Sequence, residues 1–345
     1  MTTRVPIAVA GAGLIGRRHL DAIAQSHGAA LAAIVDPAPA ARDLAAAWGV
    51  PWYPDIGDLP QGGVAGVILA TPNQMHVAGA LACIARGLPV LIEKPLATDA
   101  QGATRIVAAA EGADIPTLTG HHRRHNPLIA AARAQITGGA LGQVLSVHGM
   151  FWLKKPDDYF DLAWRREPGA GPVFLNLIHD IDLLRHLVGE ITAVQAVQSN
   201  AVRGHAVEDS CVMTLEFDNG ALGTVNVSDA IPAPWSWEMT AAENPAYPAT
   251  DQACYWIGGT KGALELPRGR LWHHAGKQGW WEPLSATLAP RASGDPLVIQ
   301  ADHFADVIAG RAEPLVSARE GMNTLNVTLA VQTAAREGRR VTLAA

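Results

Sequence analysis

A glycine-rich segment near the N-terminus, VAGAGLIG, constrains the fold of this chain more than any other feature. Three glycines stand there in the spacing G-x-G-x-x-G, directly after an apolar run at 6–10 and at the start of a helical stretch at 14–26. The first glycine permits a tight turn, the second lets the backbone approach a pyrophosphate, and the third lets the helix pack closely on the strand. The N–H groups that begin the helix then face the phosphates. The segment predicts a dinucleotide-binding unit whose pyrophosphate contacts are Gly11, Gly13, Leu14, Ile15 and Gly16.

An acidic residue stands where the second strand of such a unit ends. Asp36 follows an apolar run at 31–35 and comes twenty residues after the last glycine of the loop. A carboxylate there accepts hydrogen bonds from the adenosine ribose hydroxyls and repels a 2′-phosphate. Pro37 and Ala38 follow, with no adjacent arginine to receive that phosphate. The sequence therefore favours NAD over NADP as the cofactor.

The first 120 residues alternate short, wholly apolar runs with alanine-rich helical stretches. The expected strands are 6–10, 31–35, 67–70, 90–92 and 115–118, and the expected helices are 14–26, 39–48, 75–86 and one between the last two strands. Strands that are apolar throughout, each followed by a helix, belong in a parallel sheet covered on both faces. We therefore predict an α/β fold whose N-terminal domain, residues 1–122, is a doubly wound Rossmann sheet that binds NAD.

The pattern changes after about residue 140. The expected strands are 143–153, 191–199, 211–217 and 221–228, and the expected helices are 173–187, 297–309 and 318–336. Asn219-Gly220 stands between the last two strands, which is a hairpin signal. We predict that residues 123–345 form a second α/β domain, with a largely antiparallel sheet and a helix on one face.

Composition and charge exclude several classes of protein. The net charge is −6 and no block of Lys or Arg stands out, which argues against nucleic acid as a partner. No apolar stretch reaches about 18 residues, so no membrane span is expected. The N-terminal apolar run is too short for a signal peptide, and we expect a cytoplasmic protein. Three widely spaced cysteines, Cys83, Cys211 and Cys254, argue against a disulfide framework or a thiolate metal site.

The segment VLIEKPLATD places a lysine at the end of a buried strand. Parallel strands direct their C-terminal ends at the cofactor crevice, so Glu93 and Lys94 should line it together with residues 71–76. A free lysine has a pKa of about 10.4, and partial burial beside a positive nicotinamide ring would lower it toward use as a base. Pro95 fixes the backbone behind the lysine. These residues favour Lys94 as an acid/base group, and a lysine paired with Glu93 at a strand end is the alternative.

Four segments together resemble one known family. They are GAGLIGRRHL, ATPNQMHVAGALACIARGLPVLIEKPLA, GHHRRHNP and WRREPGAGPVFLNLIHDIDLLRHLVGE. The chain resembles, over almost its whole length, the Gfo/Idh/MocA oxidoreductases, which include glucose-fructose oxidoreductase and inositol dehydrogenases. The resemblance implies a C-terminal domain with an open, mostly antiparallel sheet that is often used for oligomerisation. It also implies that Lys94 is the catalytic lysine. The cofactor contacts it implies are Thr71, Pro72, Asn73, His76, Glu93, Trp164 and Arg165.

The segment VFLNLIHDIDLLRHLVG is amphipathic at helical period. Its apolar stripe is Leu177, Ile181, Leu184 and Leu187, and the residues off that stripe are Asn176, His179, Asp180 and Asp182. The resemblance implies that His179 is the active-site histidine that hydrogen-bonds the substrate hydroxyl. Where the family has an aspartate four residues earlier, this chain has Leu175, with Asn176 next to it. Because an amide cannot take a proton, a Lys-Asp-His relay is not expected, but Asn176 can orient a hydroxyl.

Two histidine-rich segments have other interpretations. HHRRH, which begins at His121, carries two arginines that would repel a cation, and no carboxylate or thiol is near, so we predict no metal. It should be a loop beside the nicotinamide, with His122 and Arg124 as cofactor or substrate contacts. LWHHAGKQGWW is expected to be a β-hairpin surface or a packing element.

Taken together, these features predict an NAD-dependent dehydrogenase that acts on a secondary alcohol of a sugar, cyclitol or related polyhydroxylated molecule. Lys94 would accept the hydroxyl proton, and His179 would hold the hydroxyl. One alternative is an NAD-dependent glycoside-cleaving enzyme that uses transient oxidation. The other is a non-catalytic, dinucleotide-binding regulatory protein. We expect a homodimer or homotetramer with a small-molecule substrate and with neither nucleic acid nor a membrane as partner.

Overall fold

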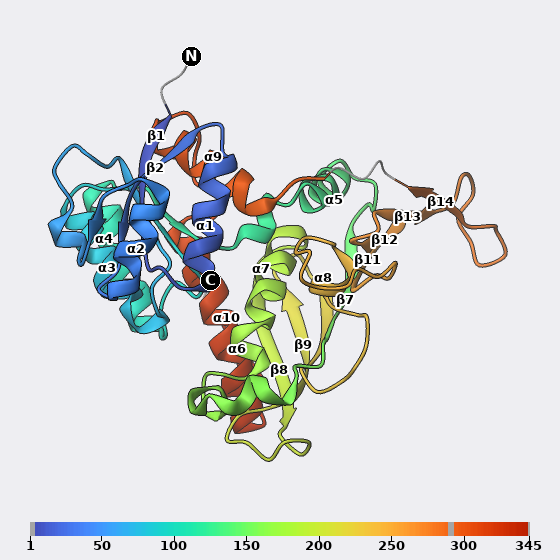
Figure 1. Ribbon diagram of the computed structural model, residues 1–345. Coiled ribbons are helices and arrows are strands. Elements are labelled where there is room, and N and C mark those ends of the chain that lie inside the picture. Colours follow the sequence, from blue (N-terminus) through green and yellow to red (C-terminus); the bar gives the residue numbers. More distant parts are fainter. Residues whose placement is uncertain (1–3, 289–292, 344–345) are drawn as a thin grey trace. The chain divides into compact units, whose positions relative to one another are not determined.

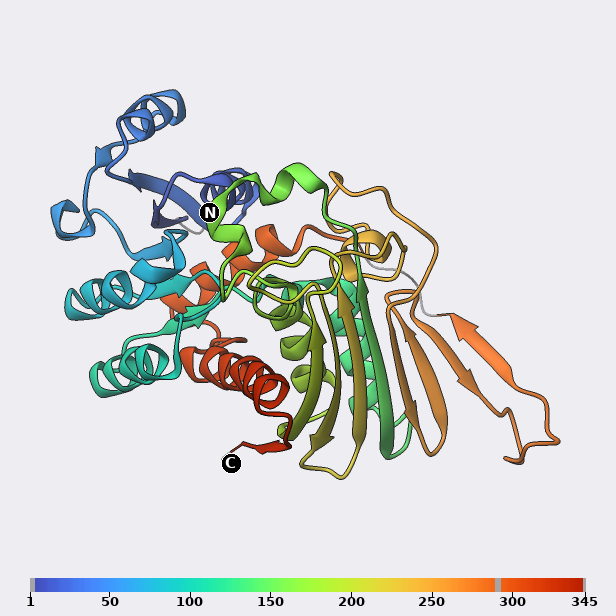
Figure 2. The same ribbon diagram turned by 90° about the horizontal axis from the view of Figure 1, so that it is seen from below.

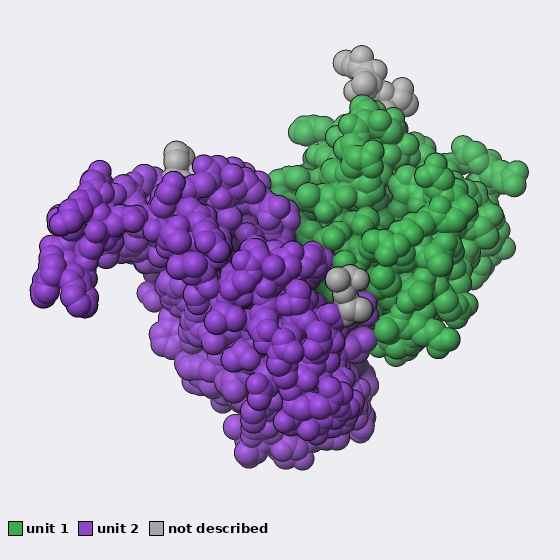
Figure 3. Space-filling view, turned by 180° about the vertical axis from the view of Figure 1, so that it is seen from behind, with its two compact units in different colours: residues 1–126, 294–325 green, residues 127–293, 326–345 purple. Residues whose placement is uncertain are grey.

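The computed structural model describes residues 4–288 and 293–343, which form two compact units (Figures 1 and 3). The first unit runs up to Asn126 and also contains residues 294–325. The second contains residues 127–293 and the segment that begins at Asn326. The predicted boundary places residues 294–325 in the C-terminal domain. They lie with the first unit because Asp302 of helix α9 (Pro296–Ile308) accepts hydrogen bonds from Ser26 Oγ at 2.6 Å and Gly28 N at 2.7 Å.

The first unit is built on a six-stranded parallel sheet with the order β3-β2-β1-β4-β5-β6. Its strands are β1 (Val5–Ala10), β2 (Ala29–Val35), β3 (Trp52–Tyr53), β4 (Gly66–Leu69), β5 (Val90–Ile92) and β6 (Thr117–Thr119). Its connecting helices are α1 (Leu14–Gln25), α2 (Pro39–Trp48), α3 (His76–Ala85) and α4 (Ala100–Ala113), with the short helices η1 (Ile56–Asp58), η2 (Asn73–Met75) and η3 (His122–His125). Strands β1, β4 and β5 are buried because helices cover both sheet faces, which confirms the predicted doubly wound fold.

The second unit contains a nine-stranded sheet with the order β14-β13-β12-β11-β7-β10-β9-β8-β15. Its strands are β7 (Val144–Trp152), β8 (Ile191–Ser199), β9 (Ser210–Phe217), β10 (Leu222–Ser228), β11 (Tyr255–Gly259), β12 (Gly262–Leu266), β13 (Arg270–His273), β14 (Ser285–Leu288) and β15 (Val341–Thr342). Every pairing is antiparallel except that of β7 with β10, which is parallel. The prediction of a mostly antiparallel second sheet is confirmed, including the hairpin at Asn219-Gly220.

The longer helices of the second unit lie on one face of this sheet (Figure 2). They are α5 (Pro127–Thr137), α7 (Leu177–Leu187) and the C-terminal half of α10 (Ala318–Glu337), and the shorter helices are η4 (Asp157–Asp161), η5 (Ala163–Arg166), α6 (Pro172–Leu175) and α8 (Trp237–Thr240). The strand register places one continuous row on the opposite face, which we call the open face. That row is Gln195, Thr214, Thr224, His148, Trp256, Glu265, Arg270 and Leu288.

The helix predicted over 173–187 differs from the observed one in two respects. It is broken at Asn176 (φ −110°, ψ −56°), which separates α6 from α7. The predicted polar stripe is also buried, since Asp180 and Asp182 are each only 1% exposed. Burial of Asp180 is compensated by a hydrogen bond that it accepts from the hydroxyl of Tyr255. None of the described helices combines the length and the apolarity needed to cross a membrane.

Candidate functional site

The carboxyl ends of four strands in the first unit bring the predicted cofactor residues to one edge of the sheet. The glycine loop follows β1, Asp36 follows β2, Thr71 lies just beyond β4, and Glu93 with Lys94 follows β5. Strand β2 pairs with one edge of β1, and β4, which comes later in the chain, pairs with the other edge. Ligands of open α/β sheets bind at such a point, where the strand order reverses.

The three glycines of the loop differ in the space that a side chain would have at each position. Gly11 has φ +100°, and a Cβ there would lie 2.4 Å from the carbonyl oxygen of Ala70. A Cβ on Gly16 would lie 1.9 Å from the carbonyl oxygen of Gly11, so close packing excludes any side chain there. A Cβ on Gly13 would meet no atom within 4 Å. The first and third glycines are therefore required by the fold, whereas the second leaves open space for a ligand.

Helix α1 begins at this open space in a way that suits an anion. Gly13 is its N-cap residue and supplies no side chain, and the first turn contains no acidic residue. The N–H group of Arg17 donates to the Gly13 carbonyl at 3.0 Å, so the N–H groups of the preceding turn have no acceptor within the helix. Together with the positive end of the helix dipole, these groups fit a pyrophosphate. Leu14 is 88% exposed at the same place.

Asp36 lies beside a cavity of about 230 Å³ at the ends of β1, β2 and β4. Its Oδ2 accepts the N–H of Ala12 and its Oδ1 accepts the N–H of Ala38, both at 2.8 Å. Each carboxylate oxygen retains further acceptor capacity, so Asp36 can hold the glycine loop and still receive ribose hydroxyls. The walls of the cavity include Gly11, Val35, Ile56, Thr71, Pro72 and Met75. A second carboxylate, Asp55, also lines the cavity, and its Oδ1 accepts the N–H of Gly57 at 2.7 Å. An otherwise largely apolar cavity with Asp36 at the end of β2 fits the adenosine half of NAD.

A buried, hydrogen-bonded pair of side chains, Glu93 and His19, lies directly behind Lys94. Glu93 is 5% exposed, and its Oε1 accepts a hydrogen bond from Nε2 of His19 in α1 at 2.8 Å. Its Oε2 accepts the backbone N–H of Lys94 at 3.1 Å. Burial alone would raise the pKa of Glu93, but the hydrogen bond from His19 and the charges of His19, His122 and Lys94 lower it to about 2. Glu93 is therefore ionised, and the predicted nicotinamide contact of this residue remains a prediction.

His76 connects the two loops that flank this pair. Its Nδ1 lies 2.7 Å from the carbonyl oxygen of Pro95, and its Nε2 lies 3.0 Å from that of Thr71. Burial lowers the pKa of His76, although both carbonyls favour its charged form. The ring braces the Thr71 loop against the Lys94–Pro95 segment. Within the described residues the buried Oγ1 of Thr71 has no hydrogen-bond partner, which suits a ligand contact.

The basic segment predicted beside the nicotinamide is largely interior. Arg124 is only 5% exposed and forms an ion pair with Glu320 at 3.0 Å, so its charge is balanced within the unit. His125 packs against His303, with ring centroids 5.1 Å apart. His122 is partly exposed and lies near enough to Glu93 to affect its pKa. No group of three or more His, Cys, Asp or Glu in the described ranges is arranged to hold a metal ion.

The second unit carries the predicted substrate-side residues at the break between α6 and α7. The backbone N–H of His179 donates to the carbonyl of Asn176 at 3.1 Å, and His179 is 7% exposed. The side-chain Oδ1 of Asn176 is buried and has no hydrogen-bond partner among the described residues. An amide oxygen in this state favours a ligand that donates a hydrogen bond.

The other predicted contacts of this unit lie in η5. Trp164 is 53% exposed, and the guanidinium of Arg165 lies 4.0 Å from the ring centroid of Tyr159. Nη1 of Arg165 also donates to the Tyr159 carbonyl at 2.7 Å. Stacking and the hydrogen bond together fix the arginine, whereas the indole remains available to a ligand.

Sequence reasoning missed a group of buried charges near α6. Glu208 accepts the N–H of Val173 at 3.0 Å and occupies the space above Gly171, where a Cβ would lie 2.1 Å from its Oε1. Lys155 lies 3.1 Å from Oδ2 of Asp229. Both lysine and aspartate follow the ends of the parallel strands β7 and β10. Polar residues that follow neighbouring parallel strands lie at the same edge of a sheet. That rule would have identified Lys155 and Asp229 if the sequence had indicated that β7 and β10 pair in parallel.

Comparison with known proteins agrees with these two units. Residues 5–121 match the model of an oxidoreductase family with an NAD-binding Rossmann fold, and residues 129–265 match that of the GFO/IDH/MocA C-terminal domain. Inositol 2-dehydrogenase from Arthrobacter sp. (strain FB24) is 30% identical over 286 residues, 78% of each chain. Rhizopine catabolism protein MocA from Rhizobium meliloti is 30% identical, covering 67% of this chain and 73% of that protein. The crystal structure of the WlbA dehydrogenase from Bordetella pertussis, in complex with NADH and UDP-GlcNAcA, has a TM-score of 0.80 and 27% identity, covering 99% of this chain and 100% of that one.

The two kinds of loop glycine are expected to respond differently to the same substitution. Gly16→Ser should lower the free energy of unfolding by roughly 1–3 kcal/mol, because its Cβ meets backbone. Gly13→Ser should leave stability unchanged, since serine is a good N-cap residue. It should weaken NAD binding about tenfold or more, because the new side chain enters the phosphate space. Thermal unfolding and titration calorimetry measure both effects, and equal NAD affinity of Gly13→Ser and wild type would refute the assignment of that space.

The Glu93 carboxylate should make stability depend on pH in acid. Its folded pKa lies below the ordinary value of 4.5, so its contribution is complete above that pH and is lost as the pH falls towards 2. Replacing it by Gln should cost about 3 kcal/mol at pH 6, and the difference should disappear near pH 2. Urea unfolding of both proteins across this range measures it. A constant difference between them at all pH values contradicts an ionised Glu93.

Proposed function

Because the chain belongs to the Gfo/Idh/MocA family of oxidoreductases, we propose that it oxidises a secondary alcohol of a sugar, cyclitol or related polyhydroxylated compound with NAD. The observation that carries the proposal is the position of Lys94, which follows β5 at the same edge of the sheet as a glycine loop that fits a pyrophosphate. The names of an inositol 2-dehydrogenase and of a dehydrogenase in complex with UDP-GlcNAcA support a polyhydroxylated substrate.

The residues of the first unit would hold NAD in three groups. The glycine loop, with Leu14 and Ile15, receives the pyrophosphate, and Asp36 receives the adenosine ribose. The nicotinamide half would be contacted by Thr71, Pro72, Asn73, His76, Glu93, Lys94 and His122. When bound, NAD supplies the acceptor for the hydride that leaves the carbinol carbon.

Lys94 acts on the proton of the same alcohol. Its Nζ, in the neutral form, takes the proton from the hydroxyl oxygen as the carbon–oxygen bond becomes a carbonyl. The backbone of Lys94 is held by Glu93, which is held in turn by His19, so the amine starts from a fixed position. A base within hydrogen-bond reach of the hydroxyl can contribute roughly 10²–10⁴-fold to the rate.

His179 and Asn176 would hold the substrate. His179 hydrogen-bonds the hydroxyl that is oxidised, and the amide oxygen of Asn176 accepts a hydrogen bond from a neighbouring hydroxyl. The amide at position 176 cannot exchange a proton, so it can orient the substrate but cannot pass on the proton that Lys94 takes. Trp164 and Arg165 would add contacts to the dinucleotide.

We place this activity in the cytoplasm and in a homodimer or homotetramer. The three cysteines are buried and free, as suits a reducing compartment. Exposed apolar side chains on the second sheet, including Val197, Val212 and Leu222, favour association through that sheet.

Replacing Lys94 by Met should lower kcat by at least about 100-fold while leaving NAD affinity largely intact. The reason is that methionine keeps the aliphatic stem but cannot accept a proton. Lys154→Met, at an exposed lysine of the second unit, is the matched control and should keep full activity. Steady-state kinetics and NAD titration measure the two effects. A fully active Lys94→Met variant would contradict the assignment of Lys94 as the group that accepts the proton.

A substrate screen separates the proposed function from its alternatives. Thermal shift with NAD and a panel of polyols, sugars and sugar acids should identify ligands, which are then assayed for NADH formation. We expect net NADH from at least one polyhydroxylated compound. Release of an aglycone from a glycoside without net NADH would favour the glycoside-cleaving enzyme. Tight NAD binding with no turnover across the panel would favour a regulatory protein.

A further inference from the structure

Glu208 is a buried carboxylate that the proposed reaction does not use. It is 8% exposed and comes two residues before β9. Burial raises the pKa of Glu208, and the nearby charge of Asp229 adds to this effect, whereas the N–H of Val173 and the charge of Lys155 act against it. A buried carboxyl group is costly unless its oxygens are hydrogen-bonded, so the contacts of Glu208 show which part of the molecule it supports.

One of these contacts fixes the start of α6. Oε1 of Glu208 accepts the N–H of Val173, the second residue of this helix, at 3.0 Å. The N-cap residue of α6 is Gly171, which has no side chain to accept that N–H group, as a Ser, Thr, Asp or Asn would. The carboxylate occupies the space of the missing side chain, because a Cβ on Gly171 would lie 2.1 Å from Oε1 and 2.5 Å from Oε2. Glu208 therefore caps α6 from a position 35 residues away in the chain.

The position of the Asn176 amide depends on this single helical turn. The N–H of Leu175 donates to the carbonyl of Gly171, and that of Asn176 donates to the carbonyl of Pro172, both at 3.1 Å. The N–H of His179 then donates to the Asn176 carbonyl. Within the described residues the buried Oδ1 of Asn176 has no hydrogen-bond partner, so no bond to that oxygen holds it. The backbone of α6 therefore decides where the oxygen lies.

Glu208 is itself attached to the sheet of the second unit. The N–H of its neighbour Asp209 donates to the carbonyl of Ser199, the last residue of β8, at 2.9 Å. The hydroxyl of Ser228, the last residue of β10, donates to the Asp209 carbonyl at 3.0 Å. The carboxylate thus connects the ends of two strands to the first turn of α6. Binding groups are held most accurately when a supporting side chain ties them to a rigid element in this way.

We propose that Glu208 is a positioning residue, which fixes the Asn176 amide where it can accept a hydrogen bond from a substrate hydroxyl. The inference rests on the proposed function, because that function gives the Asn176 oxygen its role. Without the carboxylate, the N–H of Val173 loses its acceptor and the turn from Gly171 to Asn176 loosens. Glu208 acts through α6 and takes no part in the transfer of the proton or the hydride.

Hydrogen exchange followed by mass spectrometry tests the contact without any substrate. Glu208→Ala should speed amide exchange in peptides that cover residues 172–179 by at least about tenfold, because the cap of α6 is lost. Glu208→Gln keeps an oxygen in the same place and should exchange like the wild type. Gly171→Ala should reproduce Glu208→Ala, because its methyl group displaces the carboxylate, while the φ of −71° at this position suits any residue. The double variant Gly171→Ala/Glu208→Ala should exchange no faster than either single variant.

Steady-state kinetics connects the contact to substrate binding. The probe is inositol or, if another compound of the panel forms NADH faster, that compound. Its KM should rise about 5- to 10-fold in Glu208→Ala and in Gly171→Ala, which corresponds to the loss of one hydrogen bond. The kcat and the NAD affinity should stay within about twofold of the wild type, because only a contact that binds the substrate is weakened. Glu208→Gln should restore the KM, which a general loss of stability does not predict.

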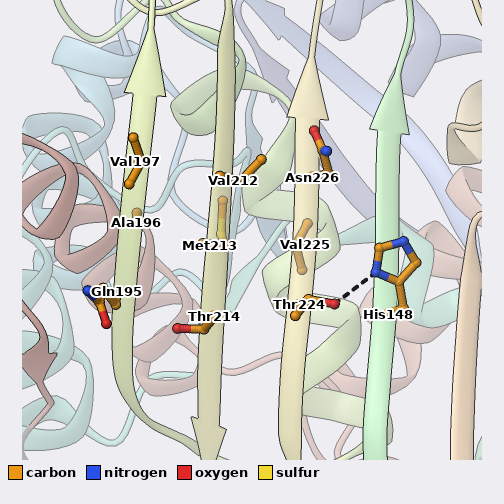
Figure 4. Close-up of a pocket in the computed structure, with 10 residues that line it drawn as sticks. All are labelled: His148, Gln195, Ala196, Val197, Val212, Met213, Thr214, Thr224, Val225 and Asn226. Atoms are coloured by element: carbon orange, nitrogen blue, oxygen red, sulfur yellow. Dashed lines mark hydrogen bonds between the residues drawn. The ribbon is translucent and has the colours of Figure 1, made fainter.

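Thr224→Val is the matched control. Oγ1 of Thr224 lies 2.8 Å from Nδ1 of His148 on the open face of the sheet (Figure 4). This variant also removes one side-chain hydrogen bond from the second unit, but on the face away from the core in which Val173 packs. Its exchange in residues 172–179 and its KM should match those of the wild type. Thermal unfolding confirms that each variant is folded at the assay temperature.

The outcomes separate this inference from the proposed function. Unchanged exchange or an unchanged KM in Glu208→Ala overturns the role of Glu208, and so does a Glu208→Gln variant that behaves like Glu208→Ala. A wild-type protein that forms no NADH from any compound of the panel overturns the proposed function, and with it the role of Asn176, whatever the exchange rates are.

Discussion

The buried pair of His19 and Glu93 determines how the candidate site of the first unit is held together. His19 belongs to the helix that starts at the pyrophosphate loop, and Glu93 receives the N–H group of Lys94. The place where phosphates would bind and the place where a proton would be accepted are thereby parts of one rigid piece. Removing one member of such a buried pair leaves an uncompensated charge, at a cost of roughly 3–5 kcal/mol. The pair is favourable only while both members stay buried and bonded.

Close packing of glycine makes room for that pair. A Cβ on Gly120 would lie 3.0 Å from the Cδ of Glu93, and Gly11 approaches the backbone of Ala70 even more closely. These contacts draw β1, β4, β5 and β6 together at their carboxyl ends, where polar groups gather. Packing and electrostatics therefore act together at this site, because a methyl group at Gly11 or Gly120 would displace the backbone or the Glu93 carboxylate that it meets.

Local patterns in the sequence predicted the elements that depend on neighbours in the chain. Wholly apolar runs gave the parallel strands, and glycine spacing gave the loop at Gly11–Gly16. These local patterns did not predict features that depend on contacts between residues far apart in the chain. Asp180 lies off the predicted apolar stripe, but it is buried, and it accepts a hydrogen bond from the hydroxyl of Tyr255, which stands 75 residues away on a strand. The two-residue strand β3 and the docking of α9 on α1 likewise depend on contacts that no local period records. No local pattern pairs His19 with Glu93, because the two residues lie 74 positions apart in the chain.

The parallel strand ends explain why the second unit also collects charges at one place. β7 and β10 run parallel, and each continues into a polar residue, Lys155 after the first and Asp229 after the second. Burial lowers the pKa of Lys155, and the carboxylate of Asp229 offsets part of that effect. Arg203 pairs with the same carboxylate. The one parallel pairing in an otherwise antiparallel sheet thus creates a charged edge close to Glu208, which holds the start of α6. Since α6 ends at Asn176, the position of the Asn176 amide follows from this pairing, as the position of Lys94 follows from the parallel sheet of the first unit.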